Sequence, residues 1–203
     1  LLGDAAAFVY PRFPDYRAAV DNARPAVNVA ALIGHTALRS NHMDDLLRSA
    51  SPEEIAAMRE QLRDSLEAGA LGLSTGLAYA SAFSAETSEV KQLAEELSAF
   101  GAIYTTHLRS EFEPVLEAMA EAFDIGRHAR SPVIISHMKC AGAGNWGRSP
   151  QLLAALEKAA QDHPVGCDCY PYAASSSTLD LKQVTDAFRI TITWSTPHPD
   201  QGG

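Results

Sequence analysis

The feature that most constrains the fold is a regular alternation of short apolar runs with stretches of helical spacing. Apolar runs rich in β-branched residues cover 26–34, 70–76, 102–106, 132–136 and 164–170. The later runs begin about 30 residues apart, which is the length of one strand-plus-helix unit. The runs are almost continuously apolar, as in parallel strands that are covered on both faces. The sequence therefore predicts an α/β fold with a parallel sheet.

Four stretches between these runs carry helix signals: 51–68, 87–100, 113–129 and 149–163. The first opens with Ser51 as N-cap and Pro52 at the first helical position. Gly101 follows the second, where a left-handed glycine commonly ends a helix. A doubly wound sheet and a β/α barrel both satisfy this order, and five or six repeats fit the middle of an eight-unit barrel. No boundary between domains is visible.

The composition argues against several classes of protein. The 203 residues are 46% hydrophobic and 20% charged, which is a globular rather than a disordered balance. A net charge of −9 without a basic face argues against nucleic-acid binding. No apolar run approaches the roughly 18 residues of a membrane span. Three cysteines favour a reducing, cytoplasmic location, and we expect Cys167 and Cys169 to be buried and inert.

Polar or aromatic side chains follow four of the predicted strands: His35, His107, His137 and Tyr170. The carboxyl ends of parallel strands meet at one edge of the sheet, where the chemistry of such folds takes place. Imidazoles gathered there suit zinc, whose catalytic sites take about three protein ligands and leave one position for water. The alternative is that His107 and His137 only form hydrogen bonds with neighbouring loops.

A cation lies two residues after each of the last two histidines, Arg109 in one case and Lys139 in the other. A cation beside a metal is a poor ligand, but it binds an anionic substrate group well. The alternative is an ordinary salt bridge with Glu111, Glu113 or Asp168. No G-x-S-x-G elbow and no P-loop is present, so a serine hydrolase or a nucleotide hydrolase has no supporting motif.

Several segments together resemble a known family. They are "NVAALIGHTALR", "GALGLSTGLAY", "YTTHLRSE", "VIISHMKCAG" and "CDCYPYAASSSTLDL". Their order and spacing are similar to those of the D-aminoacylases, the N-acyl-D-amino-acid deacylases of the amidohydrolase superfamily, essentially from end to end. The resemblance implies a zinc-dependent β/α (TIM-like) barrel beside a small β-sandwich. It also implies hydrolysis of the amide bond of N-acyl-D-amino acids to a carboxylate and a D-amino acid.

The resemblance also implies roles for individual residues. His107 and His137 match the two histidine zinc ligands on successive strands. Lys139 and Tyr170 match residues that hold the substrate carboxylate, and Ser176 falls near the same anion site. Arg109 either supports the metal ligands or faces the substrate.

Some features of the family have no counterpart in this sequence. The His-x-His pair of the first strand, the following cysteine ligand and the general-base aspartate of the last strand are absent. The chain begins with Leu1, so we expect residues 1–203 to be part of a longer protein and to contain about strands 3 to 7 of the barrel. The aspartate would lie beyond residue 203, and the accessory β-sandwich would lie outside as well.

Three expectations follow for such a partial barrel. The piece alone should be inactive, and its open sheet edges invite self-association. The substrate should be a small molecule, with neither a nucleic acid nor a membrane as partner. The alternatives are another amidohydrolase, such as a dihydropyrimidinase-like cyclic amidase, and a non-catalytic remnant.

Overall fold

The computed structural model describes residues 10–172, 174–176 and 189–191. One five-stranded sheet has the strand order β1-β2-β3-β4-β5, and each strand pairs in parallel with the next. The strands are β1 (Ile33–Gly34), β2 (Gly72–Gly76), β3 (Ile103–His107), β4 (Val133–Ile135) and β5 (Val165–Cys167). Consecutive strands are therefore neighbours, as repeated strand–helix units require. This confirms the predicted α/β fold with a parallel sheet.

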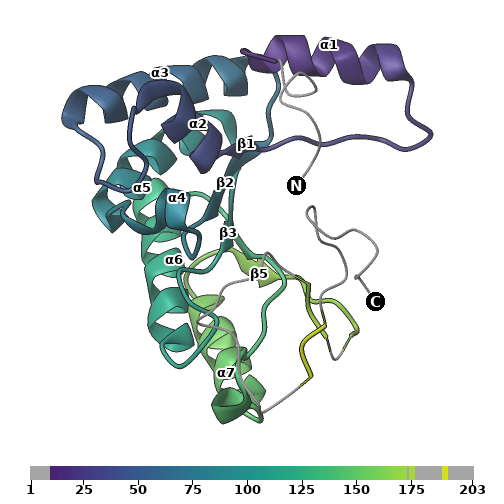
Figure 1. Cartoon of the computed structure of the whole chain (residues 1–203), viewed down its shortest axis with the longest axis vertical. Helices are drawn as coiled ribbons and strands as arrows, with labels where there is room; N and C mark the ends of the chain where they lie inside the picture. The colour runs from purple at the N-terminus through teal and green to yellow at the C-terminus, as the bar shows by residue number, and fades with distance from the viewer. Residues whose placement is uncertain (1–9, 173, 177–188, 192–203) are drawn as a thin grey trace.

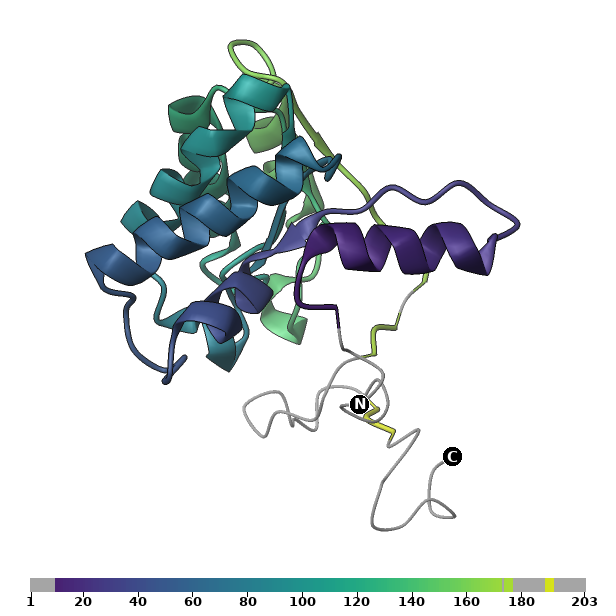
Figure 2. The same ribbon diagram turned by 90° about the horizontal axis from the view of Figure 1, so that it is seen from above.

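Helices follow the strands along one side of the sheet (Figure 1). The α-helices are α1 (Phe13–Ala23), α2 (His35–His42), α3 (Pro52–Glu67), α4 (Ala80–Phe83), α5 (Thr87–Ala94), α6 (Val115–Ala129) and α7 (Ser149–Ala159). Two 3₁₀ helices, η2 (Glu95–Phe100) and η3 (Ala143–Asn145), complete the described elements. Helix α1 projects away from α3, α5 and α6, as the view from above shows (Figure 2).

Helix α3 shows why the predicted helices form where they do. Ser51 Oγ accepts a hydrogen bond from the Glu54 amide at 3.2 Å, and Glu54 Oε2 accepts one from the Ser51 amide at 2.7 Å. This capping box satisfies two amides that a helix start leaves without partners. One face of α3 is buried in the core through Ile55, Met58, Leu62 and Leu66.

The strands alternate between two faces, and this alternation places the side chains that matter later. Leu73, Tyr104 and Val133 share one register position on the helix-covered face, and all three are fully buried. His107 lies on the opposite face, in register with Gly76. On that opposite face Ile134 is only partly buried, whereas Thr105 beside it is buried.

Two predictions about local structure were wrong. The first apolar run, 26–34, forms a strand only at Ile33–Gly34, and residues 26–30 are exposed rather than buried in the sheet. Cys167 and Cys169 are exposed rather than buried. Strand β5 is an edge of the described sheet and Cys169 lies beyond its end, so neither thiol is covered.

Helices α1, α2 and α4 were not predicted either. Helix α2 contains Thr, Ser, Asn and two His residues, which have modest helix propensity, so its sequence carries little helical signal. Among the described residues, none of the helices combines the length and apolar character that a membrane span requires.

Candidate metal centre

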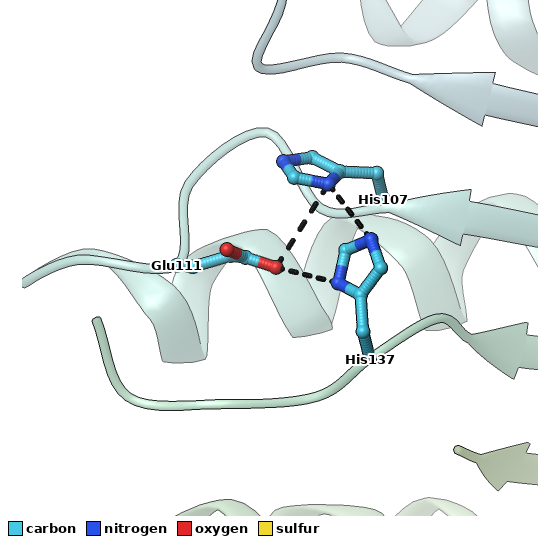
Figure 3. Close-up of side chains that lie close together, drawn as sticks. All are labelled: His107, Glu111 and His137. Carbon is cyan, nitrogen blue, oxygen red and sulfur yellow. Dashed lines mark hydrogen bonds and ion pairs between the residues drawn. The ribbon is translucent and has the colours of Figure 1, made fainter. Parts of the chain in front are cut away.

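Two histidines and a glutamate converge at the carboxyl edge of the sheet (Figure 3). His107 is the last residue of β3, and His137 lies two residues after the end of β4. Their nearest ring nitrogens, His107 Nδ1 and His137 Nε2, are 3.0 Å apart. Glu111 Oε1 is 2.9 Å from His137 Nδ1 and 3.9 Å from His107 Nδ1. The structure thus brings the two predicted strand-end imidazoles together.

An unusual backbone conformation turns His137 toward His107. Its φ of 42° lies in the left-handed region, which residues other than glycine seldom adopt. Asp168 supports this turn from the end of β5. Its Oδ1 accepts a hydrogen bond from the His137 amide at 2.6 Å, and its carbonyl accepts one from the Met138 amide at 2.8 Å. Strain of this kind is typical of sites whose surroundings fix a required geometry.

The predicted cation Lys139 lies in the same cluster. Its Nζ is 2.5 Å from Glu111 Oε1 and 2.8 Å from His137 Nδ1. The ammonium group also lies 5.4 Å from the centre of the Tyr170 ring, within the range of a cation–π interaction. The salt bridge with Glu111 that the sequence offered as an alternative is therefore present. Lys139 and Tyr170 also lie together, as the resemblance implied.

Arg109 points to a different part of the protein. Its Nε and Nη2 donate to the carboxylate of Glu121 on α6 at 2.8 to 3.2 Å. Nη1 and Nη2 also donate to the carbonyls of Phe83 and Ala85, each at 3.0 Å. The prediction that Arg109 pairs with Glu111, Glu113 or Asp168 was wrong. Helix α6 packs beside β3 and presents Glu121 to Arg109 instead. These contacts do not support a substrate-facing role for Arg109.

His35 does not join the other two histidines, contrary to expectation. The chain turns directly from β1 into α2 at this residue, which sends the side chain into the core. His35 is fully buried, and its Nε2 is 2.8 Å from Glu89 Oε1 on α5. Ser176 is exposed, and its predicted role stays a prediction. The expected aspartate beyond residue 203 lies outside the described residues.

The donor set of this cluster fits a zinc ion. Zinc binds imidazole nitrogen and carboxylate oxygen, and two nitrogens on one tetrahedral zinc ion lie roughly 3.3 Å apart. The observed separation of 3.0 Å needs only a small ring rotation to match. Burial lowers the pKa of His107, although the charge of Glu111 opposes this, so the neutral ring that metals bind is favoured. Within the described residues, His107, Glu111 and His137 are the group of side chains close enough to hold a metal ion.

Sequence reasoning considered Glu111 only as a salt-bridge partner and missed it as a member of the metal cluster. Its position depends on the path of the loop after β3, which hydrophobic periodicity does not report. A weak signal was present, because Glu111 is the first acidic residue after His107 and lies in the segment that returns toward α6.

Several known proteins are similar to this chain in sequence and in fold. A profile of the Amidohydrolase family matches residues 1–202. A D-aminoacylase from Alcaligenes xylosoxydans xylosoxydans is 42% identical over 203 residues, which is all of this chain and 42% of that protein. A crystal structure of D-aminoacylase, described as defining a novel subset of amidohydrolases, superposes with a TM-score of 0.95 at 42% identity. It is matched over 100% of this chain and 43% of its own.

A third relative was solved with bound ligands. It is an N-acyl-D-glutamate deacylase from Bordetella bronchiseptica in complex with zinc and a phosphonate inhibitor that mimics the tetrahedral intermediate. Its TM-score is 0.88 at 41% identity, over 95% of this chain and 41% of that one. This chain thus spans well under half the length of the relatives it matches. Because the family profile covers almost every residue and the fold agrees, the chain belongs to the amidohydrolase family.

Proposed function

We propose that this chain is part of a zinc-dependent hydrolase that cleaves the amide bond of N-acyl-D-amino acids, giving a carboxylate and a D-amino acid. The observation that carries the proposal is the juxtaposition of two facing imidazole nitrogens with the ammonium of Lys139 at one edge of the sheet. The D-aminoacylase relatives support the choice of substrate, and the zinc-bound deacylase supports the choice of metal.

Each residue of the cluster has a role in this proposal. His107 Nδ1 and His137 Nε2 hold the zinc ion, because these two nitrogens face each other. When bound, zinc supplies a Lewis acid and lowers the pKa of a water molecule to about 7. Lys139 and Tyr170 bind the carboxylate of the substrate, and the Tyr170 ring also packs against the ammonium group of Lys139. Ser176 and Arg109 keep their roles only as sequence-based predictions.

The proposal places the described sheet within a larger barrel. Strands β1 and β5 each have one neighbour in the described residues, so each presents an edge that further strands would pair with. The five strands would then correspond to about strands 3 to 7 of a β/α barrel. The remaining metal ligands and the general-base aspartate would come from outside residues 1–203. The isolated chain should therefore be inactive, and we expect it to self-associate through its edges. A cytoplasmic location also stays a prediction.

Turnover of N-acetyl-D-amino acids by the full-length, zinc-loaded protein tests this proposal. We expect His107→Ala and His137→Ala each to abolish turnover and zinc binding. His128→Ala is the matched control, because His128 lies in the last turn of α6, where it is exposed and pairs with Glu95 rather than with a residue of the site. Retained turnover in either of the first two variants would overturn the ligand assignment.

Two further measurements address the alternatives. Competition between an N-acyl-D-amino acid and a cyclic amide would separate the proposed substrate from that of a cyclic amidase, because a cyclic amide has no α-carboxylate for Lys139 to bind. Calorimetric titration of the 203-residue chain with zinc addresses the non-catalytic remnant. Tight stoichiometric binding would count against that reading.

A further inference from the structure

Three polar atoms of the metal cluster form a close triangle. His137 Nδ1 lies 2.9 Å from Glu111 Oε1 and 2.8 Å from Lys139 Nζ, and these last two atoms are 2.5 Å apart. A neutral imidazole carries its proton on one nitrogen only. Nδ1 can therefore donate to Glu111 or accept from Lys139, but it cannot do both. One of the two short contacts with Nδ1 is not a hydrogen bond.

The choice between these partners decides whether His137 can bind a metal. Its other nitrogen, Nε2, faces His107 Nδ1 at 3.0 Å. If Nδ1 carries the proton and donates to Glu111, Nε2 presents a lone pair. If Nδ1 accepts from Lys139, the proton sits on Nε2 and blocks that position. The residue that controls Nδ1 thus controls the metal-binding face of the ring.

We propose that Glu111 is the positioning residue of this site. Its Oε1 accepts the Nδ1–H of His137, which fixes the tautomer with Nε2 free, and the same oxygen accepts a hydrogen bond from Lys139. The inference rests on the proposed function, because the tautomer of His137 matters only if Nε2 binds a metal ion. Metal-binding histidines commonly donate their second nitrogen to a carboxylate in this way.

The charges in the triangle favour Glu111 over Lys139 as the partner of Nδ1. The Glu111 side chain is 12% exposed, so few water molecules can hydrogen-bond to its carboxylate. The carboxylate therefore needs hydrogen-bond donors from the protein. Donation by both Nδ1–H and Lys139 gives it two. The opposite tautomer would set the Nδ1 lone pair against a carboxylate oxygen at 2.9 Å. The Nδ1–H tautomer sets two donors, Nδ1 and Lys139 Nζ, at 2.8 Å from each other, but the anionic oxygen between them accepts from both.

The geometry also separates this role from that of a metal ligand. Glu111 Oε1 contacts the Nδ1 side of the His137 ring, whereas Nε2 is the nitrogen turned toward His107 (Figure 3). The same oxygen is 3.9 Å from His107 Nδ1, which is 1 Å beyond its contact with His137. Glu111 therefore acts through His137 rather than on the ion.

Nitrogen NMR of the metal-free, full-length protein labelled with ¹⁵N-histidine tests the tautomer directly. At pH 8.5 we expect the neutral His137 ring in the wild type to be in its Nδ1–H form. Glu111→Gln should keep it, because the amide oxygen still accepts. Glu111→Ala should shift the ring to the Nε2–H form, and Glu113→Gln, an exposed acid nearby, should have no effect. An Nε2–H ring in the wild type, or no change in Glu111→Ala, would overturn the proposal.

Zinc affinity provides the second readout, measured by competition with a chelator. Loss of a partner that orients a ligand costs about 10–100-fold in metal affinity, so we expect that loss in Glu111→Ala and a smaller one in Glu111→Gln. If both variants lose zinc as completely as His137→Ala, then Glu111 is itself a ligand and the positioning role is wrong. If the wild type binds no zinc, the proposed function fails, and the NMR result alone decides the role of Glu111.

Discussion

Replacing Arg39 by methionine should destabilise the protein more than any exposed substitution, because this guanidinium is fully buried. Its Nη1 donates to both carboxylate oxygens of Glu89, at 2.7 and 2.8 Å. The remaining donors bind the carbonyls of Ser81, Leu46 and Arg48, at 3.2, 3.0 and 2.6 Å. Removing one partner of a buried ion pair costs about 3–5 kcal/mol, because the other charge stays buried without its counter-ion; Glu89 would keep only its contact with His35 Nε2. That is a large part of a typical unfolding free energy of about 5–15 kcal/mol.

Urea unfolding followed by far-ultraviolet circular dichroism measures this loss in Arg39→Met. The matched control is Arg12→Met, which removes an ion pair with Asp15 whose arginine side chain is 74% exposed. Exposed pairs contribute about 0–1 kcal/mol, so the control should be nearly neutral. A loss below about 1 kcal/mol in Arg39→Met would refute the reasoning, because it would mean that the buried carboxylate needs no cation.

The same substitution should change the acid sensitivity of the protein. Burial acts to raise the pKa of Glu89, but hydrogen bonds from His35 and Arg39 outweigh it and hold the pKa below the ordinary value of 4.5. A lowered pKa contributes stability above about pH 4.5, and this is lost as the pH falls through the folded-state pKa. Without Arg39 the pKa of Glu89 rises, so acid unfolding should begin at a higher pH. Unfolding midpoints measured between pH 3 and 7 would show this, and parallel pH profiles for the two proteins would contradict it.

Four further substitutions separate capping, packing and site roles. Ser51→Ala should cost about 1 kcal/mol in thermal unfolding, because it removes the side chain that caps α3; an unchanged midpoint would contradict this. Gly126→Ala should cost about 1–3 kcal/mol, because its Cβ would lie 2.1 Å from Val133 Cγ2; an alanine variant as stable as wild type would refute the close approach of α6 to β4. Lys139→Met should raise the KM for an N-acyl-D-amino acid, and an unchanged KM would remove Lys139 from the substrate site. Arg109→Met should lower stability, because it leaves Glu121 without its cation, and unchanged stability would contradict this.

The sequence predicted the sheet because hydrophobic periodicity is a local property of the chain. The five apolar runs and the signals around α3 could be read without knowing what packs against them. Helix α2 could not be read in this way. Its residues favour a helix only weakly, and the helix is fixed by contacts with distant partners, among them the pair between Arg39 and Glu89. Tertiary contacts of this kind can override helix propensity, and they do not appear as a periodic pattern of apolar residues in the sequence.

The same distinction explains which site residues were found. The sequence predicted both His35 and His107 to follow a strand, but His35 comes directly after β1, one register position before that of His107, and only His107 joins the site. The difference lies in the next residues, because β1 leads directly into α2, whereas β3 leads into a loop that keeps the ring at the edge. Glu111 lies in that loop, so its contact with His137 depends on a loop path that sequence periodicity does not specify.

The pairing of Lys139 with Glu111 has a consequence for how the proposed enzyme would bind an anion. The two charges cancel, so long-range attraction by Lys139 alone is weak, and a bound zinc ion would provide most of the positive field. The ammonium has three N–H donors, and Glu111 takes one of them. A substrate carboxylate would then be selected by the direction of the remaining donors rather than by net charge. Because Glu111 fixes both Lys139 and His137 through one oxygen, the anion site and the metal site would be aligned by the same residue.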